Sequence, residues 1–151
     1  MAKILILGAG SMGTAFSVPC SDNNHQVTIV GTHLEDNFIE KINIDGVHPA
    51  LNCKIPSNVK FLKFEKLYDE LNAEIDFIAI AVVSKGIDWA ASQLSKIKNL
   101  KIPILILTKG LYINKNKYEI LADKVERIQK KNGIKKPNLI AAGGPCLAIG
   151  L

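Results

Sequence analysis

The chain has 151 residues, a length that suits one domain with a real hydrophobic core. Hydrophobic residues make up 48% and charged residues 22%, a globular composition that argues against disorder over most of the chain. The longest apolar run, 77–83, is far too short to span a bilayer, and Gly8 breaks the N-terminal run before it reaches secretory-signal length. We therefore expect a soluble, cytoplasmic protein with no membrane insertion.

The net charge is +5, and many of the positive side chains lie between Lys115 and Lys136. Acidic residues are interleaved with them and no aromatic platform accompanies the run, so we expect a solvated helix face and no nucleic-acid partner. A mild positive bias still suits small ligands that carry phosphate. The three cysteines, Cys20, Cys53 and Cys146, have no metal-ligand spacing, so we expect reduced thiols and no metal site.

Apolar runs alternate with amphipathic stretches along the chain. Six runs predict strands, at 3–7, 26–30, 59–62, 76–82, 103–107 and 138–142. Helical spacing is clearest over 87–97 and 118–128, with weaker helices at 36–44 and 63–72. The alternation predicts an α/β fold, a doubly wound parallel sheet of the Rossmann type with strand order 3-2-1-4-5-6. We expect residues 1–151 to form one dinucleotide-binding domain.

Three local features carry their own expectations. Ser84 is a suitable N-cap for the helix that follows the fourth strand. Pro19 falls inside the first helical pattern, where it should kink or shorten that helix. Residues 45–58 contain two prolines and predict a long irregular loop.

The strongest motif is Gly8-Ala9-Gly10-Ser11-Met12-Gly13, because it follows a strand directly and opens a helix. Gly8 permits the tight turn, Gly10 lets the backbone approach a pyrophosphate, and Gly13 lets the helix pack close to the strand. The N–H groups at the start of the helix, from Ser11 and Met12 onward, favour phosphate. The motif therefore predicts a dinucleotide site.

The end of the second strand bears on the choice between NAD and NADP. The strand ends at Val30 and is followed by Gly31-Thr32-His33, without the acid that would bind ribose hydroxyls. The first acid, Glu35, comes too late in the chain for that role. Thr32 and His33 accommodate a 2′-phosphate better than a carboxylate would, but no arginine accompanies them. NADP is thus mildly favoured over NAD.

Two further segments follow strands on the edge where such sheets bind ligands. Lys109, in Thr108-Lys109-Gly110-Leu111, could hold a phosphate or polarise a carbonyl, with a solvated loop lysine as the alternative. The segment 143–148 places two glycines and Cys146 after the sixth strand. The three histidines all lie in the first third of the chain and none is well placed to act as a base for Cys146, so we reject a catalytic thiol.

Taken together, G-A-G-S-M-G at 8–13, T-K-G-L at 108–111 and G-P-C-L-A at 144–148 resemble the N-terminal domain of NAD(P)-dependent glycerol-3-phosphate dehydrogenases. The resemblance implies that Ser11, Met12, Thr32, Lys109 and Ala148 contact the cofactor. It further implies that Lys109, Gly144 and Cys146 approach the substrate, although Cys146 replaces the family's usual hydroxyl residue.

The resemblance also implies an activity: hydride transfer between NAD(P)H and dihydroxyacetone phosphate, giving sn-glycerol 3-phosphate. The family's principal catalytic lysine lies in a second, helical domain, so we expect the 151-residue chain alone to be inactive and Lys109 to be its one catalytic residue. Whether the full-length parent forms a homodimer is left open. The alternatives are a 2-dehydropantoate reductase-like ketoacid reductase and a non-catalytic nucleotide-binding module.

Overall fold

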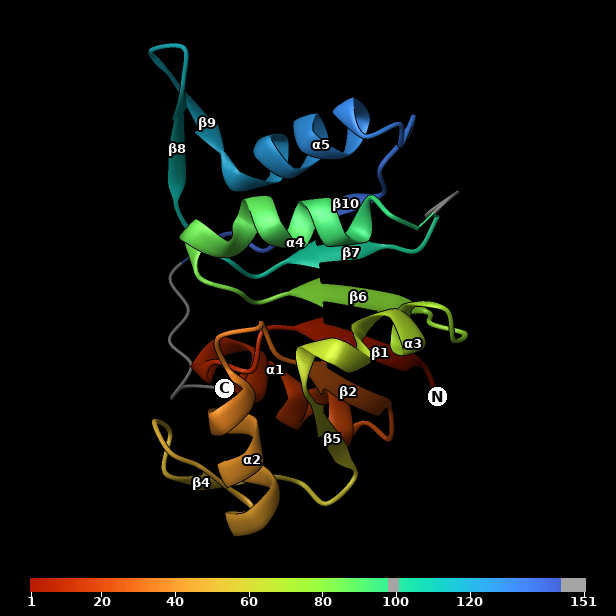
Figure 1. Ribbon diagram of the computed structural model, residues 1–151, viewed down its shortest axis with the longest axis vertical. Coiled ribbons are helices and arrows are strands. Elements are labelled where there is room, and N and C mark those ends of the chain that lie inside the picture. The colour runs from red at the N-terminus through yellow and green to blue at the C-terminus, as the bar shows by residue number, and fades with distance from the viewer. Residues whose placement is uncertain (98–100, 145–151) are drawn as a thin grey trace.

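The centre of the molecule is a six-stranded parallel sheet (Figure 1), seen in a computed structural model that describes residues 1–97 and 101–144. The strand order is β10-β7-β6-β1-β2-β5. Counted along the chain, these six strands read 3-2-1-4-5-6 from the β5 edge, so the predicted order is confirmed. The strands are β1 (Lys3–Leu7), β2 (Gln26–Val30), β5 (Val59–Leu62), β6 (Phe77–Ile80), β7 (Ile104–Ile106) and β10 (Leu139–Ala141).

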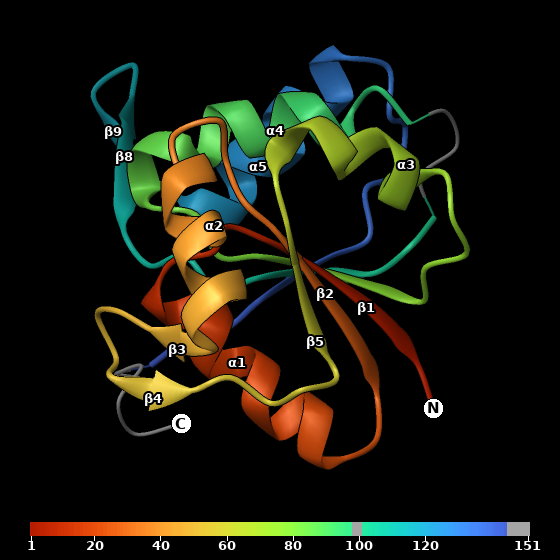
Figure 2. The same cartoon turned by 60° about the horizontal axis from the view of Figure 1, so that its bottom comes forward.

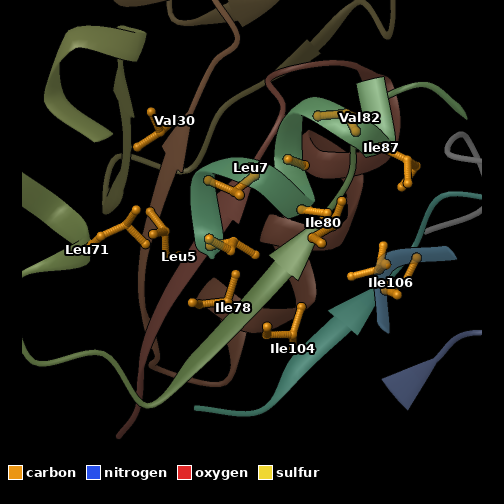
Figure 3. Packing of buried hydrophobic residues seen from close by; sticks show 14 of the residues in the cluster. Leu5, Leu7, Val30, Leu71, Ile78, Ile80, Val82, Ile87, Ile104 and Ile106 are labelled. Carbon is orange, nitrogen blue, oxygen red and sulfur yellow. The ribbon is translucent and has the colours of Figure 1, made fainter. Parts of the chain in front are cut away.

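Helices cover both faces of this sheet (Figure 2). On β1, Ile4 and Ile6 face one side, where they join residues of α1 (Ser11–Asp22) and α2 (Asp36–Asp45). Leu5 and Leu7 face the other side, which is packed by α3 (Leu67–Leu71), α4 (Ile87–Leu94) and α5 (Leu121–Lys131). Figure 3 shows part of this second cluster. Because both faces are buried, the central strands are almost wholly apolar.

Several local expectations need correction. Ser84 does not cap α4: a 3₁₀ turn, η2 (Ser84–Gly86), precedes the helix, whose N-cap is Gly86. Pro19, expected to kink or shorten the first helix, lies inside α1, and the helix continues beyond it to Asp22. The 45–58 segment is not wholly irregular, since β3 (Val47–His48) and β4 (Cys53–Lys54) form a small antiparallel pair. The 63–72 helix is split into a 3₁₀ turn, η1 (Phe64–Lys66), and the short α3.

The largest correction concerns residues 111–120. They form an antiparallel hairpin, β8 (Leu111–Asn114) and β9 (Lys117–Ile120), rather than a loop and the first turn of a helix. The hairpin projects from the body of the molecule before α5 begins (Figure 1). Within the described ranges, no helix is long and apolar enough to cross a membrane.

Candidate functional site

The turn between β1 and α1 lies where the strand order reverses, next to β6. Gly8 has a φ of +106°, and a Cβ there would lie 3.0 Å from the backbone of Ala81. At Gly13 a Cβ would lie 2.3 Å from the carbonyl oxygen of Gly8. The fold itself therefore requires both glycines, one for the turn and one for the close approach of α1 to the strand.

Gly10 is different, because the fold does not need it. Its φ of −70° is open to any residue, and the nearest atom to an added Cβ would be Oε1 of Glu35, at 4.0 Å. The space that a side chain would fill is thus free for a ligand to approach the backbone. The helix that starts at Ser11 has 12 residues and no side-chain cap, so its first N–H groups face this space without an intrahelical partner.

Glu35 comes back to this turn from the start of α2. The N–H of Glu35 donates to the carbonyl of Thr32 at 3.0 Å, which closes a tight turn. Oε2 of Glu35 then accepts from the N–H of Thr32 at 2.6 Å and from the N–H of Ala9 at 3.4 Å. The premise that Glu35 comes too late in the chain is therefore wrong. Its carboxylate lies between the glycine turn that follows β1 and Thr32, which follows β2.

A pocket of about 430 Å³, here called the β2-side pocket, opens beside this carboxylate. Two aromatic side chains line it, His33 and Trp89, whose ring centroids lie 6.3 Å apart, and Phe64 packs against Trp89 at 5.5 Å. Its lining is mainly apolar, and the residues that matter below are Thr32, His33, Glu35, Val82, Lys85 and Trp89. A flat aromatic ligand group fits such a wall.

A second pocket of about 490 Å³, the β7-side pocket, opens on the other side of the glycine turn. Lys109 lines it, is exposed, and donates from Nζ to the carbonyl of Ala142, which joins the ends of β7 and β10. Thr108 donates from Oγ1 to the carbonyl of Val82 at 2.6 Å. Both pockets include Gly10 and residues 81–83, so they adjoin at the carboxyl edge of the sheet, and the two together are here called the groove.

The structure thus brings together most of the residues singled out from the sequence. Six of them line the groove: Gly10, Ser11, Met12, Thr32, His33 and Lys109. Gly144 is exposed, with a φ of +88°, two residues beyond the carbonyl that Lys109 binds. Cys146 and Ala148 lie outside the described residues.

Sequence reasoning missed Lys85 and Trp89 and misjudged Glu35. The signal for Lys85 and Trp89 was their place just after β6, the strand beside β1. No comparable signal exists for Glu35, because its position depends on the turn that precedes α2.

His48 is a polar residue of β3. It is fully buried, its Nδ1 accepts from the N–H of Leu51 at 3.0 Å, and its ring packs edge-on against Phe38. Burial lowers the pKa of His48, and the backbone of Ala9 acts in the opposite direction. The Nε2 of His48 is buried without a hydrogen-bond partner among the described residues.

Within the described ranges, no three His, Cys, Asp or Glu side chains gather as a metal site. Cys20 and Cys53 are free thiols, and burial raises the pKa of Cys20. A buried thiol with a raised pKa is a poor nucleophile.

Comparison with known proteins gives a family match. Residues 3–149 match the family model described as NAD-dependent glycerol-3-phosphate dehydrogenase N-terminus. The match covers nearly the whole chain, including the glycine turn, the Thr108–Leu111 segment and the segment after β10.

Curated relatives agree with this match. The chain is 31% identical over 152 residues to an NADP(+)-dependent glycerol-3-phosphate dehydrogenase from Archaeoglobus fulgidus, covering 96% of this chain and 42% of the relative. It is 28% identical over 146 residues to a glycerol-3-phosphate dehydrogenase [NAD(P)+] from Oceanobacillus iheyensis, covering 96% and 40%. The chain therefore spans about two fifths of the length of these relatives.

Solved structures show the same fold. A glycerol-3-phosphate dehydrogenase from Coxiella burnetii superposes with a TM-score of 0.78 at 23% identity, covering 98% of this chain and 42% of that one. A putative 2-dehydropantoate 2-reductase from Enterococcus faecalis superposes with a TM-score of 0.61 at 21% identity, covering 92% and 40%. At these identities the superpositions carry the fold alone.

Proposed function

The chain belongs to the family of NAD-dependent glycerol-3-phosphate dehydrogenase N-terminal domains, and from this premise we propose that it binds NAD(P)H along the groove. We further propose that it is the cofactor-binding half of an enzyme that interconverts dihydroxyacetone phosphate and sn-glycerol 3-phosphate. One observation carries the proposal: at Gly10 the space that a side chain would occupy is open, beside the start of α1 and between two pockets.

The groove fits a dinucleotide in three parts. The N–H groups at the start of α1, near Ser11 and Met12, suit the pyrophosphate. The aromatic wall of the β2-side pocket suits the adenine ring, with Thr32 and His33 near the ribose. The β7-side pocket is left for the nicotinamide, beside Lys109. The bound cofactor would supply or accept the hydride.

Lys109 is the group of this chain that we propose acts on the substrate. Its ammonium is exposed at the β7-side pocket and is oriented by the carbonyl of Ala142. There it would donate a hydrogen bond to the substrate oxygen and stabilise the negative charge that develops on it. We place Gly144 and Cys146 on the substrate side of the same edge and Ala148 on the cofactor side, as the family resemblance implies.

The cofactor preference, the catalytic activity and the location in the cell are parts of this proposal. The preference for NADPH expected from residues 31–33 depends on setting Glu35 aside as too late in the chain, whereas its carboxylate lies beside Thr32. The second candidate function is a nucleotide-binding module without chemistry. Catalysis by a protein that contains this domain decides between the two. The cytoplasm remains the expected location.

Isothermal titration calorimetry with NADH and NADPH tests the binding proposal. Gly10→Val should abolish binding of both, because its side chain enters the space at the glycine turn while the fold tolerates it. Ala73→Val is the matched control, since Ala73 is exposed and lies next to the start of β6, at the opposite edge of the sheet. If Gly10→Val folds and binds as well as the wild type, the proposed site is wrong.

A further inference from the structure

We propose that Glu35 selects the dinucleotide whose adenosine ribose has free hydroxyl groups, NAD(H), against its 2′-phosphorylated counterpart. This inference rests on the proposed function, because it assumes that the adenosine half of the cofactor occupies the β2-side pocket. It reverses the preference for NADPH that the sequence of residues 31–33 predicts.

The position of the carboxylate is the first step. An acid at the end of the second strand of this fold normally accepts hydrogen bonds from the ribose hydroxyls. Glu35 supplies an acid at that place by a different route, through the turn from Thr32, and lies beside Ala9 and Thr32. Its Oε2 is taken up by backbone N–H groups, while Oε1 faces the open space at Gly10. Oε1 is thus the oxygen available to a hydroxyl donor.

The fixed position of the charge is the second step. Two backbone N–H groups hold Oε2, and Glu35 is partly buried, so the carboxylate cannot swing away without losing both hydrogen bonds. A hydroxyl group can donate to this carboxylate. A 2′-phosphate cannot donate when ionised, and it brings a like charge to a carboxylate that has little freedom to move.

Two side chains of the same pocket act in the opposite direction. Lys85 and His33 line the β2-side pocket, and Lys85 could attract a 2′-phosphate. Both side chains are exposed, so solvent and salt screen them more than they screen the partly buried Glu35. The Glu35 carboxylate, the charge held at the glycine turn, therefore decides the preference, which is for NAD(H) over NADP(H).

The test compares two probes, ADP-ribose and its 2′-phosphorylated form, so that the nicotinamide and the substrate play no part. Binding is followed by calorimetry and by the fluorescence of Trp89, the chain's one tryptophan, which lines the pocket. The wild type should bind ADP-ribose about tenfold more tightly or better. Because like-charge repulsion is screened by salt, the ratio of the two affinities should narrow as ionic strength rises.

Two variants and a control isolate the charge. Glu35→Gln keeps the shape and the acceptor but removes the charge, so the ratio should fall to about threefold or less, mainly through tighter binding of the 2′-phosphorylated probe. Glu35→Asp keeps the charge and should keep the direction of the preference. Glu74→Gln removes an exposed carboxylate at the opposite edge and should leave the ratio unchanged.

The possible outcomes distinguish the role of Glu35 from the binding of a dinucleotide in the groove. Equal binding of both probes by the wild type, or a ratio that Glu35→Gln leaves unchanged, overturns the role of Glu35 while the groove stands. The role of Glu35 is also overturned if the preference for ADP-ribose grows with salt. Salt would then be screening an attraction between Lys85 and the 2′-phosphate, and that attraction would outweigh the repulsion by Glu35. If neither probe binds the folded wild type, the proposed function fails, and this inference fails with it.

Discussion

The two sides of the groove are held in place by different means. At the glycine turn and on the β2 side, close backbone packing sets the geometry: Gly8 and Gly13 lie against neighbouring main chain, and Glu35 is fixed by backbone N–H groups. On the β7 side, single side chains span the gaps, with Thr108 bound to Val82 and Lys109 bound to Ala142. The β2 side thus carries a carboxylate that the backbone fixes, whereas the β7 side carries an exposed ammonium held by a single hydrogen bond.

This difference suggests a division of labour. In the proposed binding mode the adenosine half contacts only residues of the described chain, so its binding should persist in the isolated domain. The action of Lys109 depends on a site that excludes water, because an exposed ammonium in high dielectric stabilises a developing charge weakly. Four measurements on variants of the chain test this contrast.

The largest effect should come from Lys109. In a protein that joins this domain to the family's substrate domain, Lys109→Ala should lower kcat/KM for dihydroxyacetone phosphate by roughly 2–4 kcal/mol of transition-state stabilisation. Lys115→Ala, in the turn of the β8–β9 hairpin, is the control and should leave kcat/KM unchanged. The 151-residue chain alone should show negligible turnover of the substrate. Steady, substrate-dependent NADPH oxidation by the short chain would contradict the proposed division of labour.

The next effect compares two glycines of one turn. Gly13→Ala should cost roughly 2–3 kcal/mol of stability, since its Cβ meets the carbonyl of Gly8 at 2.3 Å and backbone cannot move aside cheaply. Gly10→Ala should leave the thermal midpoint within a degree or two, because its Cβ meets only Glu35 at 4.0 Å. Thermal unfolding followed by circular dichroism measures both. Equal midpoints for the two variants would show that backbone packing does not set this side of the groove.

A smaller effect is expected on the β7 side. Thr108→Val keeps the shape of the side chain but removes the hydrogen bond to Val82, and it should cost about 1 kcal/mol in urea unfolding. Thr108→Ser restores the donor and should recover most of that loss. If Thr108→Val is as stable as the wild type, the hydrogen bond does not hold β6 and β7 together at this edge.

The smallest effect concerns pH and His48. Burial lowers the pKa of His48 from the usual value of 6.5, so the fold favours its neutral form. The unfolded chain then binds the proton more readily, and the contribution of neutral His48 is full above pH 6.5 and is lost as pH falls below it. His48→Gln should be less stable than the wild type at neutral pH. The difference between the thermal unfolding midpoints of the two proteins should shrink as the pH is lowered. If that difference in midpoint does not change with pH, protonation of His48 is not coupled to unfolding.

Much of the fold could be predicted from the sequence because both faces of the sheet are buried. The bounds of β1, β2 and β5 agree with the prediction to the residue. The β8–β9 hairpin was missed for the converse reason: Leu111, Ile113 and Tyr118 are largely exposed, so no buried face gives the strands a pattern. Its turn uses Lys115 and Asn116 at positive φ, without the glycine that usually marks such turns.

The site was predictable where it follows strand ends and not where it depends on a fold-back. Residues 8–13 and Lys109 lie at the carboxyl edge because they directly follow β1 and β7. Glu35 lies five residues after β2 in the chain but beside the glycine turn in space. Counting residues from a strand end cannot detect a tight turn between Thr32 and Glu35.

That turn has a consequence for how cofactor preference could change in evolution. Glu35 is the N-cap of α2, and a side chain on Gly31 would collide with Ile39 of that helix. The selecting charge is therefore attached to a helix rather than to the end of a strand. A substitution that shifts α2 along the sheet, at Gly31 or Ile39, would move the carboxylate without touching any ligand-binding residue. Lineages could then exchange one dinucleotide for the other through packing mutations outside the groove.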